Sequence, residues 1–159
     1  MNRNFLTFIF CIGLLASSSL SWANSWQLIP NNQVASQGKP IIKPQDFTSY
    51  YLNTASLKSQ LLTAGYDWAN AVIVELPTPD GQYQAFKIWQ TPILVAPMTE
   101  KYAAIKTFTG TALYNKGVTI KVDFTYSGFH AMVLDQSKTY FIDPYSNLDD
   151  GFYTCYYKR

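Results

Sequence analysis

Residues 118–134, VTIKVDFTYSGFHAMVL, carry the clearest fold signal in this chain. Apolar side chains stand at every second position from 118 to 124, and Thr, Lys and Asp fill the positions between them. This two-residue period predicts a β-strand with one buried side and one solvent-facing side. Ser127-Gly128 is typical of a turn, and residues 129–134 then return as a second strand. The stretch therefore predicts an antiparallel hairpin.

Shorter strand signals lie on both sides of this hairpin. Residues 77–81 read Pro-Thr-Pro-Asp-Gly, a combination that favours a tight turn, and β-branched or aromatic runs flank it. We therefore predict a second hairpin over 71–89. The remaining predicted strands are 139–142 and 152–157, and residues 93–95 form a further short apolar segment.

Two segments have helical spacing instead. Leu57 and Leu61 lie on one face of a predicted helix over 54–64, which Gly65 can end. Pro97 can occupy the first turn of a second helix over about 97–106. Together these elements predict an α+β fold, an antiparallel β-meander sheet with two short helices packed on it.

The N-terminus has the pattern of a secretory signal. Arg3 precedes an apolar run at 5–16, which is long enough for a signal peptide but too short to span a bilayer. Small residues then predict cleavage after Ala23. We therefore expect a signal peptide over 1–23, a secreted or periplasmic product, and no integral membrane segment after cleavage.

The remaining chain has the size of one domain and is nearly neutral. Residues 24–45 are rich in Asn, Gln, Ser, Gly and Pro, which predicts an extended or flexible lead-in, and residues 46–159 are expected to form a single domain. Without Arg3, 11 Lys and Arg residues stand against 10 Asp and Glu. A net charge this close to zero does not indicate electrostatic binding to nucleic acid or anionic lipid.

The chain is poor in the residue types that perform catalysis. Beyond the predicted signal it has one histidine, His130, and one cysteine, Cys155. Zinc sites usually take three or four ligands mainly from these two types, and the motifs of zinc peptidases, α/β-hydrolases and phosphate-binding loops do not occur. A Cys155–His130 nucleophile pair is formally open, but few residues follow the cysteine to build an oxyanion site. We therefore expect no catalytic residue, no metal ligand, no cofactor and no enzyme activity.

Three features leave a functional interpretation open beside a structural one. His130 is either a satisfied sheet residue or an interface contact whose charge changes with pH. The loop DPYSNLDDG at 143–151 is either a solvated turn or a set of calcium ligands. The tyrosines near the C-terminus form either core and strand edges or a protein-binding surface, since tyrosine offers a large contact area. The candidate interface residues are His130, Tyr145, Tyr156 and Tyr157.

Four segments in series resemble a known family. They are Ala96-Pro97 with KYAAIKTFTG at 101–110, Asp123-Phe124-Thr125 with Gly128-Phe129-His130-Ala131-Met132, Tyr140-Phe141-Ile142-Asp143-Pro144-Tyr145, and Tyr156-Tyr157-Lys158-Arg159. In this order and spacing they resemble the N-terminal region that precedes the catalytic domain in bacterial secreted reprolysin-like zinc metallopeptidases. The resemblance covers roughly residues 70–159.

The resemblance implies a propeptide-like role, in which this region assists folding of the peptidase or keeps it latent by binding its catalytic domain. No zinc ligand can be carried over, and the chain stops where the family would continue, as a truncated or fragmentary product would. In that setting Cys155 is the candidate for a thiolate switch on the zinc of the peptidase. The alternative is an unrelated secreted binding module that recognises a surface or matrix ligand through exposed aromatic residues.

Overall fold

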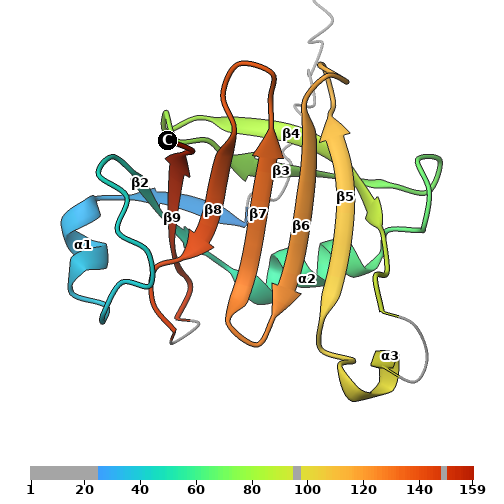
Figure 1. Ribbon diagram of the computed structural model, residues 1–159, viewed down its shortest axis with the longest axis horizontal. Helices are drawn as coiled ribbons and strands as arrows, with labels where there is room; N and C mark the ends of the chain where they lie inside the picture. Colours follow the sequence, from blue (N-terminus) through green and yellow to red (C-terminus); the bar gives the residue numbers. More distant parts are fainter. Residues whose placement is uncertain (1–24, 95–97, 148–149) are drawn as a thin grey trace, which may run out of the picture.

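One antiparallel sheet forms the body of the protein (Figure 1). The computed structural model describes residues 25–94, 98–147 and 150–159. Within these residues, nine strands follow the order β1-β2-β9-β8-β7-β6-β5-β4-β3. The strands are β1 (Trp26–Ile29), β2 (Thr48–Leu52), β3 (Val72–Pro77), β4 (Tyr83–Gln90), β5 (Lys106–Ala112), β6 (Thr119–Thr125), β7 (Gly128–Leu134), β8 (Tyr140–Pro144) and β9 (Phe152–Tyr157). The fold is therefore mostly antiparallel β with short helices, and both hairpins predicted from the sequence are confirmed.

The sheet curls into a half-barrel because its two ends approach each other. In Figure 1, β5 to β9 face the viewer, while β1 to β4 lie behind them. The Tyr50 hydroxyl of β2 donates to the carbonyl of Thr78, just after β3, over 2.8 Å. The Tyr83 hydroxyl of β4 donates to the carbonyl of Trp26 in β1 over 3.5 Å. These bonds join strands that stand far apart in the sheet order, so the sheet has a concave inner face and a convex outer face.

The concave inner face holds the main hydrophobic core. The Trp26 ring packs edge-on against Phe129, with ring centroids 5.5 Å apart, and against Tyr153 at 5.3 Å. Phe124 packs against the same Phe129 ring at 5.3 Å. Such perpendicular ring pairs add to the free energy gained by burying the rings. The alternating positions of the 118–134 stretch supply much of this core, namely Val118, Ile120, Val122, Phe124, Phe129, Ala131 and Val133.

A single short helix closes the inner side of this core. Helix α2 (Thr54–Leu62) begins after Asn53, whose side-chain oxygen accepts a hydrogen bond from the N–H of Ser56 over 3.0 Å. Its Leu57 and Leu61 side chains are buried against the sheet. The helix predicted over 54–64 is therefore confirmed. Within the described residues, no helix is long and apolar enough to cross a membrane.

The segment expected to be a flexible lead-in contains regular structure. Strand β1 pairs with β2 at one edge of the sheet, and helix α1 (Asn31–Ala35) follows it. Trp26 contributes to the main core, while Ile29 and Val34 pack in a second, smaller core. Three buried side chains within polar sequence therefore fix this segment to the sheet. The predicted signal peptide and its cleavage site near Ala23 lie outside the described residues.

The second predicted helix is largely replaced by a strand. Helix α3 covers Met98–Lys101, whereas the prediction extended over 97–106. From Lys106 onward the backbone pairs with β4 and β6 as β5, because Phe108 and Ala112 fill inner-face positions there. Residues 93 and 94 of the short apolar segment at 93–95 have no regular structure, and residue 95 lies outside the described part.

Candidate functional site

A row of polar residues crosses the convex outer face of the sheet. Asp123 on β6 lies opposite His130 on β7. Ala131 lies opposite Ile142 on β8, which places His130 beside Asp143 one position along. Since neighbouring residues of a strand point to opposite faces, this polar row stands on the side of the sheet away from the core.

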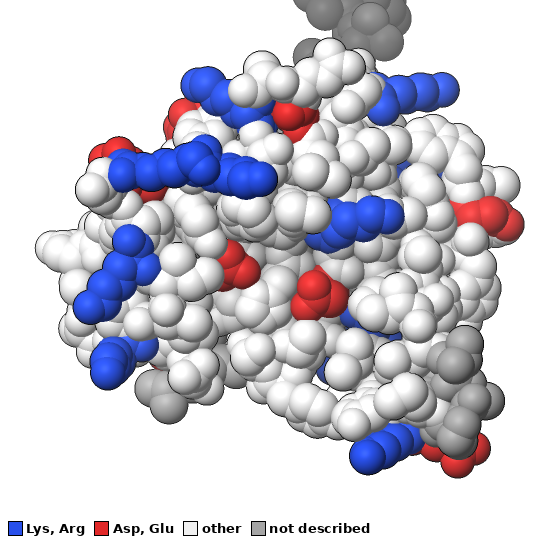
Figure 2. All heavy atoms as spheres, in the orientation of Figure 1, with Lys and Arg blue, Asp and Glu red and all other residues white. Residues whose placement is uncertain are grey.

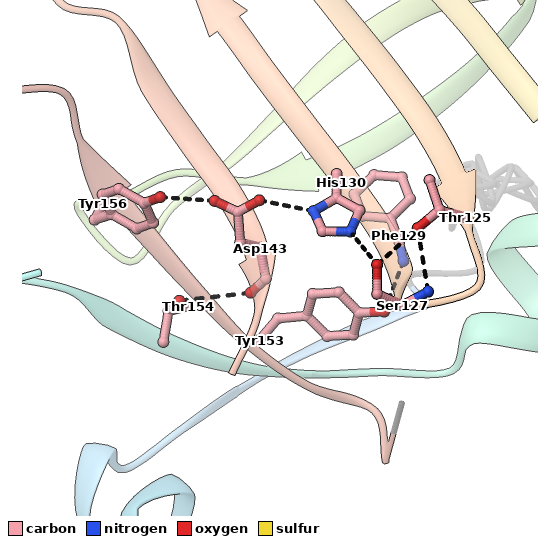
Figure 3. A network of polar contacts seen from close by, with 8 residues as sticks. All are labelled: Thr125, Ser127, Phe129, His130, Asp143, Tyr153, Thr154 and Tyr156. Atoms are coloured by element: carbon pink, nitrogen blue, oxygen red, sulfur yellow. Dashed lines mark hydrogen bonds and ion pairs between the residues drawn. The ribbon is translucent and has the colours of Figure 1, made fainter. Parts of the chain in front are cut away.

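Hydrogen bonds join this row into one network (Figure 3). His130 Nδ1 lies 2.8 Å from Asp143 Oδ1, and the Tyr156 hydroxyl donates to Asp143 Oδ2 over 2.7 Å. His130 Nε2 lies 3.2 Å from Oγ of Ser127, which in turn lies 2.8 Å from Oγ1 of Thr125. The network therefore runs from the β6–β7 turn across β7 and β8 to β9. We call the bonded residues Ser127, His130, Asp143 and Tyr156, together with Asp123, which lies opposite His130, the outer-face network.

Partial burial changes the acid–base properties of the outer-face network. The side chains of His130 and Asp143 are 28% and 15% exposed. The hydrogen bond to Asp143 raises the pKa of His130 above 6.5; burial opposes this, and the negative charge of Asp123 adds to it. Burial raises the pKa of Asp123, although His130 lowers it. Burial and the hydrogen bond to Asp143 raise the pKa of Tyr156, so its hydroxyl stays a neutral donor.

Ser127, His130 and Asp143 follow one another in the order of a hydrolase triad. A reacting serine also needs hydrogen-bond donors placed for an oxyanion. The backbone N–H groups of residues 127 and 129 are already donated to the hydroxyls of Thr125 and Tyr153. In this structure neither of these two N–H groups is free to stabilise an oxyanion.

The structure brings together two of the four residues expected at an interface. His130 and Tyr156 both belong to the outer-face network. Tyr145 is only 9% exposed and packs with Ile29, Val34 and Phe152 in the second core, so the expectation of an open Tyr145 surface is wrong. Tyr157 points to the inner side, where its ring packs at 6.3 Å from the ring of Tyr140.

Cys155 lies in the main core, which argues against the zinc-switch interpretation. Its side chain is fully buried, and the thiol contacts the carbonyl of Pro77 at 3.7 Å. Burial raises the pKa of the thiol far above its usual range, and the thiolate is the form that binds zinc. The thiol cannot reach an external zinc ion unless β9 leaves the sheet.

Two acidic residues of the loop considered for calcium, Asp143 and Asp150, form hydrogen bonds within the protein. Asp143 lies at the start of the loop, inside β8, and bonds His130 and Tyr156. Asp150 accepts a hydrogen bond from the backbone N–H of Phe152 over 3.3 Å, as in an ordinary turn. In the described part of the chain, no three His, Cys, Asp or Glu side chains are grouped so as to hold a metal ion. Asp149 lies outside that part.

Two members of the network, Asp123 and Ser127, were not singled out from the sequence. The sequence predicted the turn at Ser127-Gly128, which would pair residue 123 with 132. The turn instead occupies residues 126–127, which pairs residue 125 with 128 and therefore 123 with 130. To recognise Ser127 and Asp143 as members of the network, one must also know the side-chain conformation of His130. The alternation of a strand does not specify that conformation.

Comparisons of the chain with protein-family models, with curated proteins and with solved structures found no match.

Proposed function

We propose that this chain is a secreted, non-catalytic, propeptide-like domain that binds the catalytic domain of a reprolysin-like zinc metallopeptidase and assists its folding or keeps it latent. One observation carries the proposal. Three of the four sequence segments that resemble the family's N-terminal region meet on one surface. Asp123 and His130 come from the second segment, Asp143 from the third and Tyr156 from the fourth, and all four belong to the outer-face network.

The position of the network supports protein binding. None of the described helices covers the outer face of β6 to β8 in Figure 1. Met132 and Phe141, which lie opposite each other on this face, are partly exposed beside the polar groups. Apolar and aromatic surface around a few fixed polar groups is the composition of many protein interfaces.

The direct test mixes the chain, without residues 1–23, with a reprolysin-like zinc peptidase. We expect a complex at micromolar concentration and slower hydrolysis of casein by the peptidase. His130→Ala and Asp143→Ala should weaken both effects, while Lys101→Glu, at an exposed lysine of α3, should leave them unchanged. The absence of both complex and inhibition would refute the proposal.

The absence of catalysis is tested separately. The chain alone, with zinc added, should hydrolyse no casein. Zinc-dependent hydrolysis by the purified chain would overturn the non-catalytic proposal.

A second candidate function rests on a different surface. Trp68 is 40% exposed, and Lys87 and Lys116 place their ammonium groups 4.3 and 5.5 Å from its ring centre. Trp89 packs edge-on against it at 5.9 Å. An exposed aromatic platform of this kind suits a stand-alone module that binds a surface or matrix ligand. Retention of the chain on insoluble polysaccharide, lost in Trp68→Ala, would favour this function over the first.

A further inference from the structure

An apolar groove lies beside the outer-face network, between residues 42–46 and the strands β8 and β9. It encloses about 240 Å³. Phe141 and Tyr156 form part of its lining, with their rings tilted by 31° and their centres 5.7 Å apart. Ile42, which is 38% exposed, contributes the opposite wall. The groove therefore offers a partner a concave, mainly apolar surface, to which Pro44 and Tyr157 also contribute.

Two contacts hold the wall of the groove in place. The backbone N–H of Ile41 donates to the carbonyl of Tyr145 over 2.9 Å. At the other end, Asp46 forms an ion pair with Arg159 at 3.1 Å. The wall is attached on both sides of Ile42, so the groove exists without a ligand.

The rim of the groove is basic. Lys43, Lys158 and Arg159 line it, against one carboxylate, Asp46. Asp46 is already paired with Arg159, and within the described residues Lys43 and Lys158 form no ion pair. Figure 2 shows Lys and Arg side chains gathered on the left of this face, while acidic side chains stand near its middle. An anionic group beside the groove would therefore meet two uncompensated ammonium groups.

The groove is continuous with the proposed binding surface. Tyr156 belongs to both, because its ring lines the groove while its hydroxyl donates to Asp143. A protein that binds the outer-face network would therefore also contact the groove, because Tyr156 belongs to both surfaces.

We propose that this groove binds a segment of the partner peptidase in which an apolar side chain stands next to a carboxylate side chain. This inference rests on the function proposed above. The apolar side chain occupies the space between Ile42 and Phe141, and the carboxylate lies between Lys43 and Lys158. Rim charges of this kind govern the rate and the salt dependence of association, while the apolar contact governs the lifetime of the complex.

The probe for the test is a fluorescein-labelled hexapeptide of alternating Leu and Glu, measured by anisotropy, with the Leu–Lys hexapeptide as its counterpart. We expect the Leu–Glu peptide to bind and the Leu–Lys peptide not to bind. The double variant Lys43→Glu/Lys158→Glu should weaken binding about tenfold or more, and added salt should weaken it for the wild type. Ile42→Ser should weaken binding with little change in salt dependence. All substituted side chains are exposed, so the variants are expected to keep the fold.

Lys101→Glu is the charge control, since it reverses the charge of an exposed lysine on α3, which lies away from β8 and β9 in Figure 1. Equal binding of both peptides, or an equal loss in Lys101→Glu, would overturn the groove proposal. Stronger binding of heparin or of vesicles with anionic lipid than of the Leu–Glu peptide would overturn it in favour of those ligands.

If the rim variant still binds the peptidase normally, the groove proposal fails while the proposed function stands. If the hexapeptide binds but the peptidase does not, the proposed function fails and the peptidase is ruled out as the occupant, while the preference of the groove for an apolar and acidic segment stands.

Discussion

Consecutive residues of strand β7 point to opposite faces of the sheet and have different roles on the two faces. Phe129 and Val133 are fully buried on the inner face, where Phe129 contacts three other aromatic rings. His130 and Met132, one position along, stand partly exposed on the outer face. The inner residues gain stability from burial of apolar area, whereas His130 is held by two hydrogen bonds on a surface open to a partner. Stability and the candidate function are therefore separable within one strand.

The largest effect is expected on the inner face. Phe129→Ala should lower the free energy of unfolding by about 3–5 kcal/mol, because it removes a fully buried ring and leaves a cavity among Trp26, Phe124 and Tyr153. Urea denaturation followed by tryptophan fluorescence measures this change. Met132→Ala is the matched control on the outer face, where we expect a loss below about 1 kcal/mol. Equal losses for the two variants would contradict the division between the faces.

A smaller loss is expected within the outer-face network. Asp143→Asn keeps the shape of the side chain but replaces a charged acceptor of two hydrogen bonds, from His130 and Tyr156. We expect a loss of about 1–3 kcal/mol in the free energy of unfolding. Tyr156→Phe removes one of these bonds and should cost less than Asp143→Asn. An Asp143→Asn protein as stable as the wild type would show that the network contributes nothing to folding.

Local sequence patterns predicted the hairpins and helix α2 because their signals lie within a few neighbouring residues. The alternation at 118–134 also separates inner from outer residues correctly, since Phe129 and Val133 are buried while His130 is not. The pairing of β2 with β9 joins Thr48 to Cys155, and no local pattern encodes a contact over that separation. Strand β1 was missed for the same reason, because its four residues become a strand only by pairing with β2.

The candidate site was predictable only in part. His130 and Tyr156 were named from the sequence, yet nothing in the pattern showed that Asp143 joins them. Asp143 was assigned instead to the loop that follows it, because the end of β8 is marked weakly by Pro144. Tyr145 was misplaced because the second core depends on α1, whose burial of Val34 is not visible in a polar segment.

The smallest effect concerns pH, because His130 is partly exposed and water screens its charge. The pKa of His130 is raised in the folded state, so protonated His130 favours folding. This contribution is fully present below its unfolded pKa of 6.5 and is lost as the pH rises through the higher folded value. The pKa of Asp123 is raised as well, so its effect has the same sign but falls in a lower window that starts near 3.8.

The measurement compares the wild type with His130→Gln by urea denaturation at about pH 5.5 and about pH 8.5. The difference in the free energy of unfolding between the two proteins should be larger at the lower pH, where His130 is charged beside two carboxylates. Asp123→Asn provides the control, because it retains His130 and its bond to Asp143 and should therefore keep most of the change between these two pH values. A difference that grows as the pH rises would mean that the folded protein prefers neutral His130. Nδ1 would then donate to Asp143 while Nε2 accepts from the Ser127 hydroxyl, and the neutral imidazole would not attract an anion.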